Sequence, residues 1–169
     1  MKIAIAGAHG VGKTTFAKDL AKKLNINYIH DIVREEAIKK GFVINESTPP
    51  EVQLWLVCRQ WELEKITPES WVADKSLFDY LVYGEIILKD DNLKKMIRDI
   101  VKRNAHYDPV FYLSIEFPME LDGVRSEDEK FQREVDRHYK KTLEEFGIKY
   151  IVVSGSPKER IKQALEHLK

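Results

Sequence analysis

A glycine-rich segment near the start of the chain contains the residues with the most specific chemistry. Residues 7–14 read GAHGVGKT, which satisfies the pattern GxxxxGK followed by Ser or Thr. Glycines let such a loop curl so that successive backbone N–H groups point at phosphate oxygens. The lysine brings a positive charge to the outer phosphates, and the threonine hydroxyl is suited to coordinate Mg²⁺. We therefore predict a P-loop that binds the phosphates of ATP or GTP together with Mg²⁺.

The nucleotide-binding residues predicted from this segment supply a backbone N–H group or a side chain near the phosphates: Gly7, His9, Gly10, Val11, Gly12, Lys13 and Thr14. Among them, Lys13 is expected to be catalytic and Thr14 to be a metal ligand. The helix that follows directs its N-terminal dipole at the same anion. His9 occupies a variable position, which we interpret as a spacer whose backbone binds phosphate; a catalytic role is the alternative.

Two acidic residues follow short apolar runs that read as strands. Asp74 ends the run 71–73, where a carboxylate can hold Mg²⁺ beside the phosphates, directly or through water. Asp31 follows 28–30, and a carboxylate there is placed to accept a proton from an acceptor hydroxyl. Ligands of open α/β sheets lie outside the carboxyl ends of the strands, which suits both residues. For each of them the alternative is a helix N-cap.

These residues need a framework of strands and helices. Apolar runs predict five strands, at 2–6, 28–30, 71–74, 109–115 and 150–153. Helical spacing predicts seven helices, from the loop to residue 24, at 33–40, 51–66, 77–88, 93–104 and 127–146, and from 157 onward. Strands that alternate with helices imply a parallel sheet covered on both faces. We predict one α/β domain over 1–169, a three-layer sandwich with a five-stranded parallel sheet.

Composition excludes several classes of protein. Lys plus Arg and Asp plus Glu both total 28, so the net charge is zero and a general nucleic-acid binder is disfavoured. The single cysteine allows no intramolecular disulfide and no cysteine-based metal cluster. No apolar stretch approaches the roughly 18 residues of a transmembrane helix. We expect a cytoplasmic protein without membrane contact.

The motifs together resemble the small P-loop kinases, most similar to nicotinamide riboside kinase-like domains and more distantly to deoxynucleoside and thymidylate kinases. The P-loop alone is highly specific; the other motifs persuade through their order. Two of these motifs follow the loop: Thr15, and residues 31–35, where relatives read Glu-x-x-Arg-Glu. The others are the helix segment 53–64, residues 74–76 with Tyr83, residues 122–125, and residues 153–156 with residues 159–160. Two departures stand out. Asp31 is one methylene shorter than the usual Glu, and Lys75 replaces a frequent Arg, so it acts as a point charge.

The resemblance implies a Mg²⁺-dependent transfer of the γ-phosphate of ATP to a nucleoside or nucleoside-like hydroxyl. It adds Thr15, Ser154 and Ser156 to the nucleotide-binding residues, although a plain turn with Ser156 as N-cap fits the last segment equally. It also implies a lid over about 116–137, with Arg125 as a catalytic residue that neutralises charge on the transferring phosphoryl group. On the acceptor side it places Asp31 as the base, with substrate contacts from a set of side chains: Arg34, Trp55 and Arg59.

Several alternatives remain open from the sequence. Trp55 lies on helical spacing with other apolar residues, which favours core packing over substrate contact. The alternative acceptor is a nucleoside monophosphate, whose phosphate Arg34 and Arg59 would bind. A P-loop ATPase or switch is a further alternative, although no Asp-x-x-Gly follows the third predicted strand. A nucleic-acid 5′-hydroxyl kinase is disfavoured by the balanced charge. The oligomeric state, including a homodimer, and the choice between ATP and GTP are left open.

Overall fold

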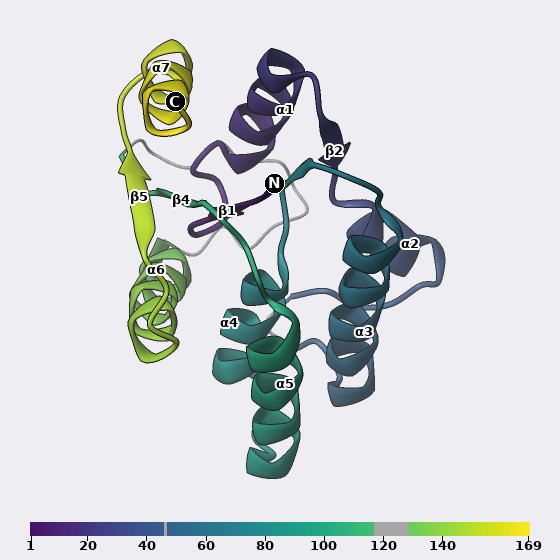
Figure 1. Cartoon of the computed structure of the whole chain (residues 1–169). Coiled ribbons are helices and arrows are strands. Elements are labelled where there is room, and N and C mark those ends of the chain that lie inside the picture. The colour runs from purple at the N-terminus through teal and green to yellow at the C-terminus, as the bar shows by residue number, and fades with distance from the viewer. Residues whose placement is uncertain (46, 117–128) are drawn as a thin grey trace.

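A single parallel sheet forms the centre of the molecule. The computed structural model describes residues 1–45, 47–116 and 129–169. Its strands are β1 (Lys2–Ala6), β2 (Asn27–Ile29), β3 (Trp71–Ala73), β4 (Val110–Leu113) and β5 (Tyr150–Val153). They lie in the order β2-β3-β1-β4-β5, and every neighbouring pair is parallel (Figure 1). The five predicted strands are thus confirmed, with β4 shorter at both ends than the predicted 109–115.

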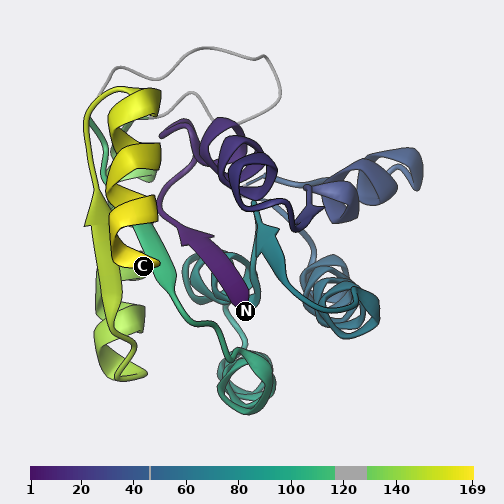
Figure 2. The same ribbon diagram turned by 45° about the horizontal axis from the view of Figure 1, so that its top comes forward.

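Helices cover both faces of the sheet. The described residues form α1 (Lys13–Leu24), α2 (Ile32–Lys39), α3 (Pro50–Ile66), α4 (Leu77–Ile87), α5 (Asp91–Asn104), α6 (Glu129–Glu145) and α7 (Pro157–His167). Helices α1 and α7 pack together on one face, whereas α4 lies on the other, in contact with α3, α5 and α6 (Figures 1 and 2). The three-layer α/β fold predicted from the sequence is confirmed.

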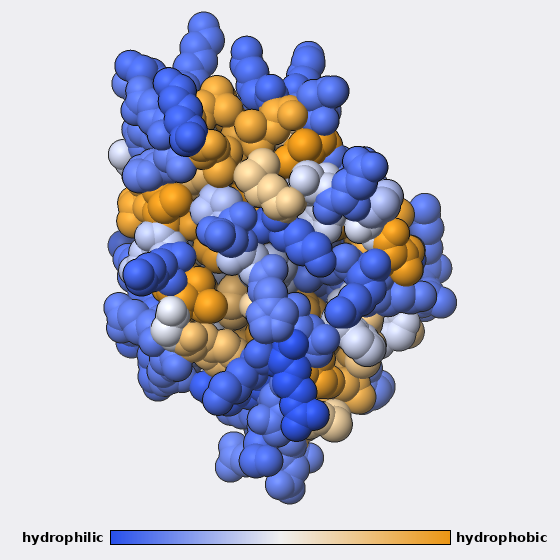
Figure 3. Space-filling model, in the orientation of Figure 1, coloured by the Kyte–Doolittle hydropathy of each residue, from blue (hydrophilic) through white to orange (hydrophobic). Residues whose placement is uncertain are grey.

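The apolar strands explain why the sheet lies between two helical layers. In β1, Ile3, Ala4, Ile5 and Ala6 are all fully buried, as are the three residues of β3. Strands that are buried on both faces read as nearly continuous apolar runs, because no side of them meets water. Most charged residues instead lie at the surface: hydrophilic side chains predominate on the face shown in Figure 3, with separate hydrophobic patches between them.

Strand register brings the sequence-predicted site residues to one edge of the sheet. Ala73 of β3 pairs with Ala4 of β1 on one side and with Ile29 of β2 on the other. The segments that leave these three strands therefore start at nearly the same level. They carry the P-loop, Asp31 and Asp74, which were predicted to meet there.

Two further predictions concern the ends of the described segments. The proposed lid, 116–137, lies mostly outside the described residues, and so does Arg125. Its described C-terminal part, from Glu129, belongs to helix α6. Within the described part of the chain, no helix is both long enough and apolar enough to cross a membrane.

Candidate active site

The P-loop backbone depends on two of its glycines. Gly7 has φ +138°, and a Cβ built there would lie 2.4 Å from the carbonyl oxygen of Leu113. Gly12 has φ +88° and is the N-cap of α1, so the helix starts directly at Lys13. Residues other than glycine rarely adopt backbone conformations with such positive φ values. The loop therefore has the tight turn and helix start that a phosphate-binding segment needs.

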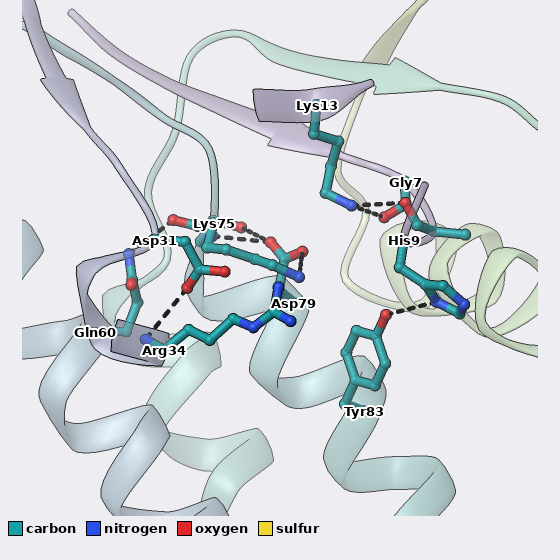
Figure 4. Close-up of polar contacts among 11 residues, drawn as sticks. Gly7, His9, Lys13, Asp31, Arg34, Gln60, Lys75, Asp79 and Tyr83 are labelled. Atoms are coloured by element: carbon teal, nitrogen blue, oxygen red, sulfur yellow. Dashed lines mark hydrogen bonds and ion pairs between the residues drawn. The ribbon is translucent and has the colours of Figure 1, made fainter. Parts of the chain in front are cut away.

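Lys13 is held inside this loop. Its side chain is almost fully buried, and Nζ donates hydrogen bonds to the carbonyl oxygens of Gly7 and Ala8, both at 2.7 Å (Figure 4). Lys13 is also the first residue of α1, so the ammonium group and the N-terminus of that helix belong to the same loop. Charge and helix dipole thus act on the same small volume, which favours an anion there.

Asp74 and Thr14 form a pair of oxygen donors beside Lys13. Asp74 is only 3% exposed, and burial raises the pKa of its carboxyl group, against the hydrogen bond from Thr14 and the charge of Lys13. The hydroxyl of Tyr28 also donates to Asp74 at 3.5 Å. Among the described residues, no group of three or more His, Cys, Asp or Glu side chains could hold a metal. Mg²⁺ in nucleotide sites uses one or two protein oxygens plus phosphates, so this pair fits it.

A cavity opens next to the P-loop, between α4 and the α2–α3 segment. It contains about 750 Å³ of empty space, its open mouth included. Its lining residues are His9, Asp31, Arg34, Ile44, Asn45, Thr48, Gln53, Leu56, Lys75, Asp79, Tyr80, Tyr83, Ile87 and Phe131. The polar residues among them come from the P-loop, the sheet edge, the α2–α3 segment and the helices α2, α3 and α4, and the apolar and aromatic ones form most of the exposed wall. A cavity of this kind suits a ligand with one polar end and one flat, apolar part.

Asp31 has both of the positions expected for it. It is the N-cap of α2, where its carboxylate accepts a hydrogen bond from the backbone N–H of Arg34 at 3.4 Å, and it also lines the cavity. Arg34 lines the cavity too, and Figure 4 shows its side chain extending toward Asp79. The guanidinium group of Arg34 makes no hydrogen bond or ion pair with another residue of the described segments.

The second cation of the cavity, Lys75, is paired. Its Nζ lies 3.3 Å from a carboxylate oxygen of the fully buried Asp79 and 5.2 Å from the ring centroid of Tyr83. Burial lowers the pKa of Lys75, but the neighbouring carboxylates, Asp79 first, raise it further, and the net direction is upward. Lys75 therefore remains charged and fixed at the wall of the cavity.

His9 does more than the spacer role expected for it. Its side chain is 5% exposed and lines the cavity, with Nδ1 3.1 Å from the hydroxyl of Tyr83. The ring of Phe131 lies 5.9 Å away, and Gln132 donates a hydrogen bond to the carbonyl oxygen of His9 at 2.7 Å. The first turns of α6 are thus attached to the P-loop through one residue. The variable position of the loop contributes a wall of the cavity.

Two residues predicted to contact the substrate lie elsewhere. Trp55 packs edge-to-face on Phe42, with ring centroids 5.4 Å apart, and Arg59 forms two 2.7 Å hydrogen bonds to Glu36 of α2. Neither lines the cavity. Residues four apart share one face of a helix, and this face of α3 is turned toward α2. Gln53, on another face of α3, does line the cavity, and its amide donates to the carbonyl oxygen of Tyr80 at 2.5 Å.

The loop after β5 has the turn structure that was the alternative to base contact. Ser156 is the N-cap of α7 and forms a capping box with Glu159. The backbone of Ser154 is hydrogen-bonded on both sides by the amide of Gln163. Gly155 donates its N–H to Glu116, the residue that ends the described segment after β4. These contacts fix the loop, and contact with a nucleotide base stays a prediction.

Arg160 lies in the run 159–160 that contributes to the resemblance, but sequence reasoning assigned it no individual role. It is 5% exposed; Nη1 donates to the carbonyl oxygen of Val11 at 2.7 Å, and Nη2 lies 3.5 Å from Glu116. One side chain of α7 thus joins the P-loop to the segment that follows β4. An arginine in an amphipathic helix normally reads as a solvated charge, so only the position of α7 over α1 reveals this contact.

Replacement of Arg160 by methionine is expected to loosen the P-loop. The variant keeps an apolar stem but loses a charged hydrogen bond, which typically contributes about 1.5–3 kcal/mol to stability. We expect the free energy of unfolding, measured with urea, to fall by about 2 kcal/mol and calorimetry to show about tenfold weaker ATP binding. Lys158→Met, an exposed position of the same helix, is the control. Unchanged ATP affinity in the Arg160 variant would show that the contact is not needed for the loop.

Comparisons with known proteins agree with this geometry. A family described as an AAA domain matches residues 2–160. The chain belongs to this family. Deoxyguanosine kinase of Bacillus subtilis (strain 168) is 22% identical to this AAA domain over 156 residues, which are 83% of the chain and 73% of the relative.

Solved structures share the fold of this AAA domain. A deoxyadenosine kinase from M. mycoides has a TM-score of 0.73 at 20% identity, over 99% of this chain and 98% of the other. A NadR protein, solved with NAD and AMP-PNP, has a TM-score of 0.79 at 16% identity, over 98% of this chain and 48% of the other. At such identities the likeness concerns the fold. The resemblance to small P-loop kinases is thereby confirmed.

Proposed function

We propose that this AAA domain is a Mg²⁺-dependent nucleoside kinase that transfers the γ-phosphoryl group of ATP to a hydroxyl group of a nucleoside. The observation that carries the proposal is the cavity, which adjoins the P-loop at His9 and is lined by Asp31 and Lys75. The predicted phosphate-donor site in the P-loop and the proposed acceptor site in the cavity are therefore adjacent. The deoxynucleoside kinases among the relatives support the same reaction. We also propose a cytoplasmic location, where ATP is supplied.

The reaction is an in-line displacement that needs positioning and charge neutralisation. The acceptor oxygen forms a bond to the γ-phosphorus while the bond from phosphorus to the bridging oxygen of ADP breaks. The hydroxyl proton passes to the carboxylate of Asp31, which lines the cavity. The N–H groups of the P-loop and Lys13 stabilise the charge on the phosphoryl oxygens, and Lys75 adds a fixed charge on the acceptor side.

Thr14 and Asp74 would hold Mg²⁺, either directly or through water. When bound, the ion neutralises phosphate charge and orients the phosphates. Three further predictions from the sequence are kept as proposals. Arg125, outside the described residues, would neutralise charge on the transferring group, and the loop of Ser154 and Ser156 would contact the nucleotide base.

The charges of the cavity favour a nucleoside over a nucleoside monophosphate as acceptor. Lys75 is paired with Asp79, and Asp31 lies in the same cavity as Arg34. The second arginine considered for a phosphate, Arg59, is engaged by Glu36, as the low pKa of that carboxyl group also indicates. A dianionic phosphate would therefore face as many carboxylates as cations. A neutral sugar hydroxyl next to Asp31 has no such repulsion.

The decisive assay offers the purified protein labelled ATP, Mg²⁺ and a panel of acceptors. The panel contains ribonucleosides, deoxynucleosides, nicotinamide riboside and the matching 5′-monophosphates. We expect at least one nucleoside to raise ATP turnover 100-fold or more above turnover without acceptor, within the range that enzymes typically reach. Lys13→Met, which removes the P-loop charge, is the control that assigns the turnover to this protein.

Each other outcome selects a different function. Turnover that responds only to monophosphates would make the chain a nucleoside monophosphate kinase, with Arg34 as the first candidate for binding the acceptor phosphate. Slow hydrolysis that no acceptor raises would favour an ATPase or switch.

A further inference from the structure

A buried polar cluster lies behind the segment that follows β3, outside the cavity. It consists of Gln60 and Glu64 from α3 and Tyr107 from the segment before β4. Gln60 is 1% exposed and Glu64 is 5% exposed. None of the three lines the cavity, and the reaction proposed above uses none of them. A buried carboxylate without a role in the reaction needs a physical reason, because burial disfavours its ionised form.

Two side chains of the cluster form hydrogen bonds to the backbone of residues 74–77, which we call the catalytic turn. The amide of Gln60 donates one hydrogen bond to Glu64 at 3.0 Å and another to the carbonyl oxygen of Lys75 at 2.8 Å, the contact at the left of Figure 4. The hydroxyl of Tyr107 donates to Glu64 at 2.8 Å and accepts from the backbone N–H of Leu77 at 3.0 Å. Glu64 therefore orients both groups that hold the turn.

The other supports of the turn come from β2 and from the first turn of α4 itself, where Ser76 and Asp79 form a capping box and Lys75 pairs with Asp79. The N–H of Asp74 donates to the carbonyl oxygen of Ile29, and the N–H of Ser76 donates to Asp79 at 2.8 Å. The turn carries Asp74 toward the P-loop and Lys75 toward the cavity. Because phosphoryl transfer depends on positioning, a displacement of about 1 Å there lowers the rate by about 100-fold.

The hydrogen-bond directions favour the ionised carboxylate of Glu64. An ionised carboxylate accepts and cannot donate, and here Gln60 and Tyr107 both donate to it, Tyr107 to each of its two oxygens. A proton on Glu64 would occupy one of these accepting oxygens, and its nearest partner, the oxygen of Tyr107, already accepts from Leu77. Protonation would therefore weaken the contacts on which the turn depends.

The surroundings of Glu64 bring its ionisation into the neutral range. Burial raises the pKa of Glu64 to about 7, against the hydrogen bonds from Gln60, Tyr107 and the backbone N–H of Leu77 and the positive charge of Lys2 of β1. From α4, the hydroxyl of Tyr80 interacts with the same carboxylate. Lys2 is the only one of these groups that carries a formal charge at neutral pH.

We propose that Gln60, Glu64 and Tyr107 are positioning residues for phosphoryl transfer, which hold the turn 74–77 in place while Glu64 is ionised. The proposal rests on the proposed kinase function, but it predicts a structural effect that is independent of any acceptor.

The first test is the pH profile of kcat with the best acceptor. We expect kcat of the wild-type protein to fall about tenfold per pH unit below about pH 7, as one required deprotonation predicts. Glu64→Gln should be 10- to 100-fold slower at pH 8 but flat between pH 6 and 8, with the KM for ATP within twofold. Glu62→Gln, an exposed carboxylate on the same helix, is the matched control and should keep the wild-type profile.

Tyr107→Phe separates the hydroxyl from the packing of the ring. The phenyl ring keeps its contacts with Trp71 and Phe78, so the variant should fold. We expect a lower kcat at pH 8 and unchanged KM values. An inflection near pH 7 that persists in Glu64→Gln would overturn the proposal, and so would full activity of Tyr107→Phe.

The second test needs no enzymatic activity. Hydrogen exchange of the Leu77 amide is measured by NMR at pH 6 and pH 8 and corrected for the intrinsic rate. Protection should be at least tenfold higher at pH 8 in the wild-type protein and equal at both values in Glu64→Gln. If no acceptor supports turnover but this difference appears, the kinase function fails and the positioning network stands. Equal protection in the wild-type protein at both pH values contradicts the network.

Discussion

Replacing Asp31 by asparagine is expected to lower kcat about 10²- to 10⁴-fold, the usual contribution of a general base. Asparagine caps helices as well as aspartate does, so α2 and the free energy of unfolding should change little. The substitution therefore separates the two roles that the structure gives this residue, helix cap and cavity wall. Single-turnover transfer to the best nucleoside, with unfolding by urea in parallel, measures both.

The matched control for this experiment is Asp90→Asn. Asp90 caps α5 in the same manner, accepting hydrogen bonds from the N–H groups of Asn92 and Leu93, and it does not line the cavity. It should retain both stability and activity. Transfer that is unimpaired in Asp31→Asn would remove the assignment of Asp31 as base and leave it as a cap.

The fold was predictable because its signals are local. The P-loop requires glycines at fixed positions, and the alternation of apolar strands with helices restricts the sheet to a parallel one. The same reasoning placed Asp31 and Asp74 at the correct edge of the sheet, because the carboxyl ends of parallel strands lie at one edge. In each case, residues adjacent in sequence determine the result.

The contacts that sequence reasoning did not foresee join elements that are distant in the chain. Trp55 and Arg59 point toward α2 because of the rotation of α3 about its axis, which the mixed apolar pattern of that helix does not reveal. In the sequence, Arg160 and Glu64 read as ordinary solvent-exposed charges of their helices. Their burial follows from partners about 150 and 43 positions away, Val11 and Tyr107.

The same distinction explains what the sequence could say about His9. Its backbone role follows from the loop pattern, whereas its side chain meets Tyr83 and Phe131, which come from two other helices. Only the tertiary structure places it in the cavity wall.

Replacing Asp74 by asparagine is expected to lower activity without lowering stability. A mutation in the apolar core, by contrast, lowers stability. Burial raises the pKa of Asp74 above its usual range. The folded protein therefore favours the protonated form, and the contribution of this group to stability decreases as the pH rises through its folded pKa. Asparagine resembles the neutral acid, so without Mg²⁺ the variant should be at least as stable as the wild type at pH 8. Its kcat should nevertheless fall about 10²- to 10³-fold, because a ligand of Mg²⁺ is lost.

Titration with Mg²⁺ tests this assignment directly. If Asp74 holds the ion, half-maximal transfer by the variant requires a higher Mg²⁺ concentration, and added Mg²⁺ stabilises the ATP complex of the variant less than that of the wild type. Asp99→Asn, half-exposed on α5 and paired with Lys95, is the control and should match the wild type in both measurements. A variant that loses activity but keeps the wild-type Mg²⁺ dependence would show that Asp74 supports Thr14 and the P-loop through its hydrogen bond rather than through the metal.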